Sequence, residues 1–166
     1  LAAALDAPLY TVGFPDGHDV ATAREVADAL GTTTTVRELT VDELEAAVPR
    51  VARAIDSPNA MDVQIALTLY FVADAAARDG FDRLALGQGA DELFGGYSKI
   101  EAVDHRVDAE TVRGARREVL TDLPSGLARD TLALRAGGVE PVFPLLHDAV
   151  VEAGLGLPSS LVVADG

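Results

Sequence analysis

The segment with the clearest chemical character is residues 84–97, which read LALGQGADELFGGY. An apolar run ends at Gly87, a second glycine follows, and Asp91 and Glu92 come next. Glycines can adopt backbone angles that turn successive amides toward an anion. Because Mg²⁺ prefers carboxylate and phosphate oxygens together, this pattern fits metal-bound pyrophosphate better than bare phosphate. The alternative is that the two acids only complement the dipole of a helix start.

The elements that would position this segment follow an order typical of an α/β fold. We predict strands over 9–14, 33–39 and 82–86, a helix over 20–30 capped by Asp19, a helix from Thr40 to about Asp56 that starts with a Thr40–Glu43 capping box, and a buried helix over 61–78. Strands that alternate with helices in this way predict a parallel sheet. Ligands bind beyond the carboxyl ends of such strands, so we expect three parallel neighbours with Gly13 and Gly87 at one edge.

Beyond Tyr97 the pattern becomes helical. Helices are predicted over 107–120, 126–136 and 145–153, with Pro and Gly breaks between them and no strand. The 166 residues suit a single domain, with an α/β part over 1–97 and a mainly helical part over 98–166. Since the first residues, LAAALDAP, read as the end of a helix, we expect an internal fragment truncated at both ends.

The charge balance narrows the classes of partner. The net charge is −14, from 27 acidic residues against 13 Lys plus Arg, so neither nucleic acid nor an anionic membrane is an expected partner. An acidic chain with one lysine is typical of adaptation to high salt, and a GC-rich genome explains the composition equally well. A melting temperature that rises with KCl would favour the first explanation.

Other features of the sequence give no sign of a membrane span, a secretory signal or a histidine metal site. The apolar stretch over 65–77 is too short to span a bilayer. No secretory signal is visible and there is no cysteine, which is typical of a cytoplasmic protein. The three histidines lack metal-ligand spacing; they are His18, His105 and His147. We predict that Tyr70 and Phe71 are core residues, and that Arg113, Arg116 and Arg117 form a solvated face.

Three segments resemble one family. GQGADELFGGY resembles the SGxGxDExFGGY loop in the synthetase domain of asparagine synthetases. LYTVGFPDGHD resembles the family's segment around adenine and ribose, and GVEPVFPLLHD resembles its GVExRxPFLD segment. The resemblance implies a parallel sheet of the adenine-nucleotide-binding ATP pyrophosphatase type (Rossmann-like, HUP).

The same resemblance implies a reaction and its partners. ATP and Mg²⁺ would activate the aspartate side chain as β-aspartyl-AMP with release of pyrophosphate, and ammonia would then give asparagine. The ammonia would be free or derived from glutamine by a glutaminase domain in the same or another chain. The family's SGGxDS pyrophosphate loop would lie just upstream of Leu1, so we expect the fragment alone to be inactive.

The resemblance implies different residues for nucleotide binding and for catalysis. Val12 and Gly13 would contact the nucleotide through their backbone, and Leu86 and Gly87 would lie beside it. The catalytic positions would be Gln88 near the aspartyl group, Asp91 as the ligand of Mg²⁺, and Glu92 in the same loop.

Four departures from the family pattern affect the choice of substrate. Leu86 stands where the family has serine, Gln88 for glutamate, Val142 for arginine, and His147 for an aspartate that follows one place late as Asp148. Two alternatives therefore stay open. One is a related adenylating amidotransferase with another acceptor, and the other is a non-catalytic nucleotide-binding scaffold.

Overall fold

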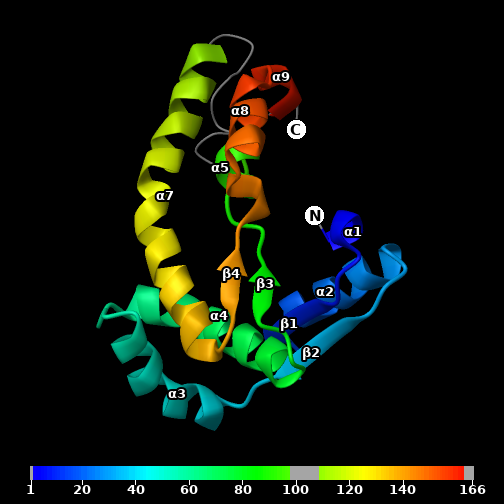
Figure 1. Ribbon diagram of the computed structural model, residues 1–166, viewed down its shortest axis with the longest axis vertical. Helices are drawn as coiled ribbons and strands as arrows, with labels where there is room; N and C mark the ends of the chain where they lie inside the picture. Colours follow the sequence, from blue (N-terminus) through cyan, green and yellow to red (C-terminus); the bar gives the residue numbers. More distant parts are fainter. Residues whose placement is uncertain (1, 98–108, 163–166) are drawn as a thin grey trace. The chain divides into compact units, whose positions relative to one another are not determined.

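The computed structural model describes residues 2–97 and 109–162, and it divides into two units. The first unit comprises residues 1–84 and 128–141, and the second comprises 85–127 and 142–166. Figure 1 shows the mixed α/β structure of the chain, with small parallel sheets among many helices. The expectations for His105 and for the start of a helix at Val107 lie outside the described residues.

The first unit is built on a pair of parallel strands. β1 (Leu9–Gly13) pairs with β2 (Thr34–Glu38) over their whole length, with Leu9 opposite Thr34 and Gly13 opposite Glu38. The two strands lie side by side in Figure 1. Both strands and their parallel direction agree with the sequence prediction.

Three helices complete most of this unit, after the short helix α1 (Ala2–Leu5). They are α2 (His18–Ala29), α3 (Val41–Ala54) and α4 (Ala60–Arg78). The prediction that Asp19 caps α2 is wrong, because Gly17 occupies the cap position and Asp19 lies in the first turn. The helix therefore starts two residues earlier than predicted, after a turn in which Gly17 N–H donates to the Phe14 carbonyl over 2.9 Å.

The helices cover opposite faces of the strand pair. Side chains alternate between the two faces of a strand, so the Val12 side chain and a Cβ added at Gly13 would lie on opposite faces. Val12 packs against the core cluster of α3 and α4, whereas a Cβ on Gly13 would lie 2.8 Å from Val20 Cγ2 of α2. Glycine at position 13 therefore lets α2 approach the end of β1 closely.

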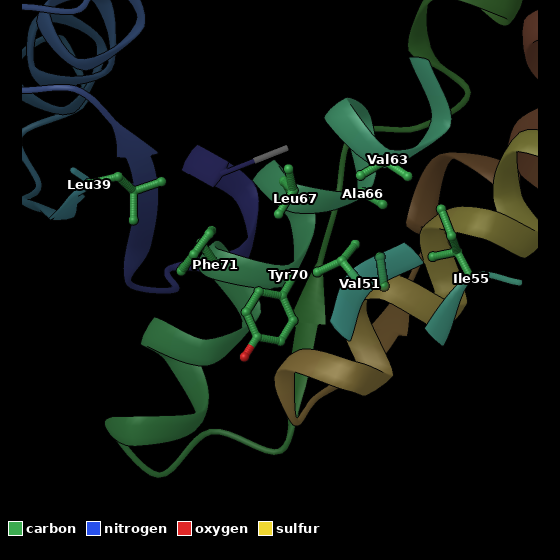
Figure 2. Close-up of a cluster of buried hydrophobic side chains, with 9 residues drawn as sticks. Leu39, Val51, Ile55, Val63, Ala66, Leu67, Tyr70 and Phe71 are labelled. Carbon is green, nitrogen blue, oxygen red and sulfur yellow. The ribbon is translucent and has the colours of Figure 1, made fainter. Parts of the chain in front are cut away.

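The core of the first unit lies around α4, as Figure 2 shows. The buried cluster consists of Leu39, Val51, Ile55, Val63, Ala66, Leu67, Tyr70, Phe71 and Ala133. Tyr70 and Phe71 meet edge to face with ring centroids 5.1 Å apart, which confirms both as core residues. Among the described residues, α4 is the one helix that is long and apolar enough to cross a membrane. The sequence argument that the apolar stretch over 65–77 is too short to span a bilayer therefore does not hold for the whole helix. In this structure α4 packs in the core.

The last part of α7 (Ala109–Gly137) belongs to this unit and packs on α4. Arg129 bonds to Asp62 of α4 over 3.2 Å and to the neighbouring Asp130 over 2.7 Å. A Cβ on Gly137 would lie 2.5 Å from the Tyr70 carbonyl oxygen of α4. The two helices are therefore in close contact at this point.

The remaining strands form a second small sheet. β3 (Arg83–Ala85) pairs with β4 (Glu140–Val142), and Figure 1 shows them running in the same direction. The prediction that all three strands are parallel neighbours in one sheet is therefore wrong, and so is the prediction of no strand after Tyr97. A three-residue strand that contains proline has no alternating pattern to detect. Its pairing with β3 joins segments that lie far apart in the sequence.

The second unit contains the glycine-rich segment and several helices. They are α5 (Ala90–Phe94), the first part of α7, the 3₁₀ helix η1 (Pro144–Leu146), α8 (Asp148–Gly156) and α9 (Ser159–Val162). The predicted break between two helices near Pro124 is absent, since α7 runs through this proline for 29 residues in all. The prediction for 145–153 is shifted, because α8 begins at Asp148.

The start of α3 gives a prediction for acid stability. Glu43 and Thr40 form the predicted capping box, and Arg37 also bonds to the Glu43 carboxylate. The hydrogen bonds from Arg37, and next those from Thr40, lower the pKa of Glu43 from 4.5 to about 2. Because the folded state binds this proton more weakly, the stabilisation is present above about pH 4.5 and is lost as the pH falls toward 2.

We therefore expect Glu43→Gln to remove part of the acid sensitivity of the fold. The difference in melting temperature from wild type should be largest near neutral pH and should shrink at about pH 3. The matched control is Glu45→Gln, an exposed glutamate on the same helix. A Glu43→Gln difference that stays constant across this pH range would contradict the assignment.

Candidate functional site

The first unit has a cavity at the carboxyl end of β1. Its volume is about 870 Å³, within the range of small-molecule sites. Val12, Gly13 and Phe14 line it from the strand, and Asp19 of α2 and Gln64 of α4 add polar groups to a mainly apolar wall. The predicted nucleotide residues Val12 and Gly13 thus lie together at the rim of a real cavity.

One backbone group at this end of the strand is already engaged. The Gly13 carbonyl accepts from Leu39 N–H over 2.9 Å, which continues the parallel ladder past β2. Gly13 also cannot carry a side chain without displacing Val20. A ligand in the cavity would therefore meet close-packed backbone at Gly13 and the side of Val12.

The second unit contains the glycine-rich segment. Leu86 is half-buried, and its N–H donates to the Val142 carbonyl over 3.0 Å, so this amide is used within the sheet. Gly87 is exposed and has open space around its α carbon. Gly89 is the constrained position, with φ of +95° and only 2.4 Å between a notional Cβ and Leu146 Cδ2. A positive φ is thus observed at Gly89 and not at Gly87, and an anion bound by these amides stays a prediction.

α5 follows immediately and separates its two acids. Asp91 is exposed, whereas Glu92 is only 7% exposed and its carboxylate accepts from Tyr97 O–H over 2.6 Å. This hydrogen bond, together with burial, raises the pKa of Tyr97 to about 12, so the phenol remains a donor at physiological pH. The Glu92 carboxylate therefore forms a hydrogen bond within its own segment, and Asp91 is the acid that is exposed.

Two glycines after α5 lie against Asp91. Gly95 has φ of +79°, and the N–H groups of Gly95 and Gly96 both donate to the Asp91 carbonyl, over 2.9 and 3.1 Å. A Cβ on Gly96 would lie 2.2 Å from Asp91 Oδ1. Gly96 therefore leaves the space that the carboxylate occupies, a role the sequence alone did not indicate.

The described side chains could supply one ligand to a metal ion that phosphate and water also bind, rather than a complete set of ligands. Within residues 2–97 and 109–162, no three His, Cys, Asp or Glu side chains group as a metal cage. One exposed carboxylate such as Asp91 is nevertheless a usual Mg²⁺ ligand when phosphate oxygens and water complete the octahedron. Half-buried Gln88 lies between Gly87 and Gly89 in the same segment.

The two departures near β4, Val142 and His147, lie in different structural contexts. Val142 ends β4 and gives its carbonyl to Leu86. His147 is the N-cap of α8, where its Nδ1 accepts from Ala149 N–H over 3.3 Å. Asp148 is the first residue of the helix, so the histidine ring fills the capping position that an acid one place earlier would take.

Sequence reasoning missed one important side chain of this unit. Arg116 was expected on a solvated face, but it is 1% exposed and donates to the carbonyls of Leu93 and Gly154. Arg117 is exposed as predicted. The sequence signal that could have indicated burial of Arg116 was its spacing from Val119. The two residues are three positions apart, so they lie on the same face of α7, and Val119 is buried.

Comparison with known proteins gives one consistent family. A family model described as asparagine synthase matches residues 1–132. A Methanocaldococcus jannaschii protein described as a glutamine-hydrolysing asparagine synthetase is 33% identical over 151 residues, which are 90% of this chain and 28% of the relative. Escherichia coli asparagine synthetase B is 28% identical over 148 residues, or 88% of this chain and 26% of the relative. The chain spans about a quarter of the length of these relatives.

Proposed function

Because the chain belongs to the asparagine synthase family, we propose that its protein is an ATP-dependent ligase that converts aspartate to asparagine. The family match carries this proposal, and the geometry of the glycine-rich segment supports it. That segment presents one exposed carboxylate, at Asp91, beside glycine backbone. The reaction belongs to the whole protein, of which this chain represents the part around the nucleotide.

The cavity beside β1 is proposed to hold the adenine and ribose of ATP. Its apolar wall suits a planar base, and its polar groups at Asp19 and Gln64 suit the ribose hydroxyls and the base edge. The fold would then be the parallel sheet of the ATP pyrophosphatase type. Leu86 and Gly87 are proposed to lie beside the nucleotide in the assembled protein.

Asp91 is proposed to hold Mg²⁺ on the departing pyrophosphate. When bound, the metal would neutralise negative charge on the phosphates during adenylation. The protein supplies a carboxylate that lies against Gly96, on a residue whose backbone carbonyl accepts from the N–H groups of Gly95 and Gly96. Gln88 is proposed to orient the aspartyl group through its amide, and Glu92 to support the loop through Tyr97.

The proposed chemistry balances in two steps. An oxygen of the aspartate side-chain carboxylate attacks the α-phosphorus of ATP, and the bond to pyrophosphate breaks. The ammonia nitrogen then attacks the acyl carbon, a proton leaves the nitrogen, and AMP departs with one oxygen of the original carboxylate. The curated relatives are named glutamine-hydrolysing, so a glutaminase domain is the proposed source of ammonia.

A second candidate is an adenylating amidotransferase with another acceptor. The observation behind it is the set of departures at Leu86, Gln88, Val142 and His147. The test incubates the full-length protein with ATP, Mg²⁺ and either ammonia or glutamine, first with aspartate and then with other carboxylic acids. Asparagine and pyrophosphate in equal amounts support the first proposal. Pyrophosphate only with another acid supports the second, and nucleotide binding without turnover supports a scaffold.

A further inference from the structure

Arg116 is the largest side chain in the described residues that is fully buried. Its guanidinium donates to two backbone carbonyls, those of Leu93 in α5 and Gly154 in α8. All three residues belong to the second unit. The planar guanidinium can serve two acceptors at fixed angles, which the single ammonium group of lysine does less well.

Both carbonyls lie near the carboxyl ends of helices, and the Gly154 carbonyl also accepts from Leu157 N–H over 3.3 Å. Leu93 lies in the last turn of α5 and Gly154 in the last turn of α8, where carbonyl groups carry partial negative charge. The Leu93 side chain is fully buried, with its Cδ2 3.3 Å from where a Cβ on Gly154 would lie. The contact between α5 and α8 is thus both apolar and charge-assisted.

α5 needs such anchors because it is short. A helix of five residues has too few internal hydrogen bonds to hold its own direction in water. Asp91 is only two residues before Leu93, and the amides of Gly95 and Gly96 bond back to the Asp91 carbonyl. Any change in the direction of α5 therefore moves the Asp91 carboxylate.

We propose that Arg116 is a positioning residue that sets the direction of α5 and so places the Asp91 carboxylate for its metal. The metal role rests on the proposed function above, whereas the anchoring role rests on the contacts of Arg116. A purely structural arginine would lower stability without a selective effect on residues 86–97 or on Mg²⁺.

The test uses two variants of Arg116 and one control in the full-length protein. Arg116→Met keeps an unbranched apolar chain and removes the donors, and Arg116→Lys keeps the charge with a different donor geometry. The control is Arg129→Met, the same substitution at a partly buried arginine of the first unit that pairs with Asp62 and Asp130.

The first measurement is amide hydrogen exchange without any ligand, well below the melting temperature. In Arg116→Met we expect the amides of 91–97 to exchange about tenfold faster or more, because a hydrogen bond to a charged group typically contributes at least this factor. Amides of α4 should be unchanged, and Arg129→Met should leave 91–97 unchanged. Equal protection of 91–97 in wild type and Arg116→Met, or a uniform rise over the whole protein, would overturn the proposal. If Arg116→Met does not fold, the same comparison is made with Arg116→Lys.

The second measurement is the Mg²⁺ concentration that gives half-maximal ATP–pyrophosphate exchange. It should rise about tenfold in Arg116→Met and less in Arg116→Lys, while Arg129→Met stays near wild type. Unchanged Mg²⁺ dependence in a folded Arg116→Met would overturn the positioning of Asp91. Selective loss of protection at 91–97 combined with an inactive wild type would support the anchoring and overturn the proposed function instead.

Discussion

Replacement of Asp91 by asparagine is expected to reduce ATP–pyrophosphate exchange of the full-length protein by about two orders of magnitude, because one electrostatic contact to a transition state is typically worth that much. The carboxylate is exposed and sits against Gly96, so its loss removes a charge from the site rather than a contact from the core. Asparagine keeps the size of the side chain and can still serve at a helix start. The measurement is radiolabel exchange between pyrophosphate and ATP over a range of Mg²⁺ concentrations.

The stability of the same variant separates metal binding from helix capping. Asp91→Asn should unfold within about 1 kcal/mol of wild type, as expected for an exposed substitution. Glu152→Gln is the control, since it changes an exposed acid of α8 in the same unit and should keep full exchange activity. A strong loss of stability in Asp91→Asn with intact exchange would show that this acid only caps α5.

A methyl group at Gly137 is expected to have the largest effect on stability. The Cβ of Gly137→Ala would lie 2.5 Å from both Ala73 Cβ and the Tyr70 carbonyl oxygen of α4. Backbone cannot move aside as the end of a side chain can, so overpacking should cost about 3 kcal/mol. The measurement is urea unfolding followed by circular dichroism.

Gly114→Ala is the control in the same helix. A Cβ on Gly114 meets no atom within 4 Å, so alanine there should stabilise α7 by roughly 0.5–1 kcal/mol through its better helix propensity. Opposite signs for the two alanines would support the close crossing of α4 and α7. Equal effects of the two substitutions would contradict it.

Local patterns in the sequence predicted the features that depend on local physics. The β1 and β2 strands, the Thr40–Glu43 capping box and the buried pair Tyr70 and Phe71 all agree with the structure. Each of these arises from a few neighbouring residues: β-branched runs, a side-chain cap or an apolar helix.

The features that sequence analysis missed depend on residues far apart. The pairing of β3 with β4 joins segments more than fifty residues apart, and a three-residue strand carries no periodicity of its own. α7 continues through Pro124 against the local helix-breaking signal, so tertiary packing overrides propensity there. Arg116 looked like a surface charge because its acceptors, two carbonyls at helix ends, are visible only after folding.

The candidate site was predicted in part for the same reason. The order of glycines and acids indicated a carboxylate beside flexible backbone, and the structure places Asp91 outward and Glu92 inward. Which acid faces out depends on the Tyr97 hydrogen bond and on the burial of Leu93. The functional roles of Val12, Gly13, Leu86, Gly87 and Gln88 stay predictions.

The central claim is that the protein activates the aspartate side chain as an acyl-adenylate, and isotope transfer tests it most directly. Aspartate labelled with ¹⁸O in its side-chain carboxylate would be incubated with the full-length protein, ATP, Mg²⁺ and ammonia, and the products analysed by mass spectrometry. The account predicts that one ¹⁸O atom appears in AMP for each asparagine formed, with pyrophosphate unlabelled. Label in inorganic phosphate together with ADP, or ATP cleavage without label in AMP, would contradict it.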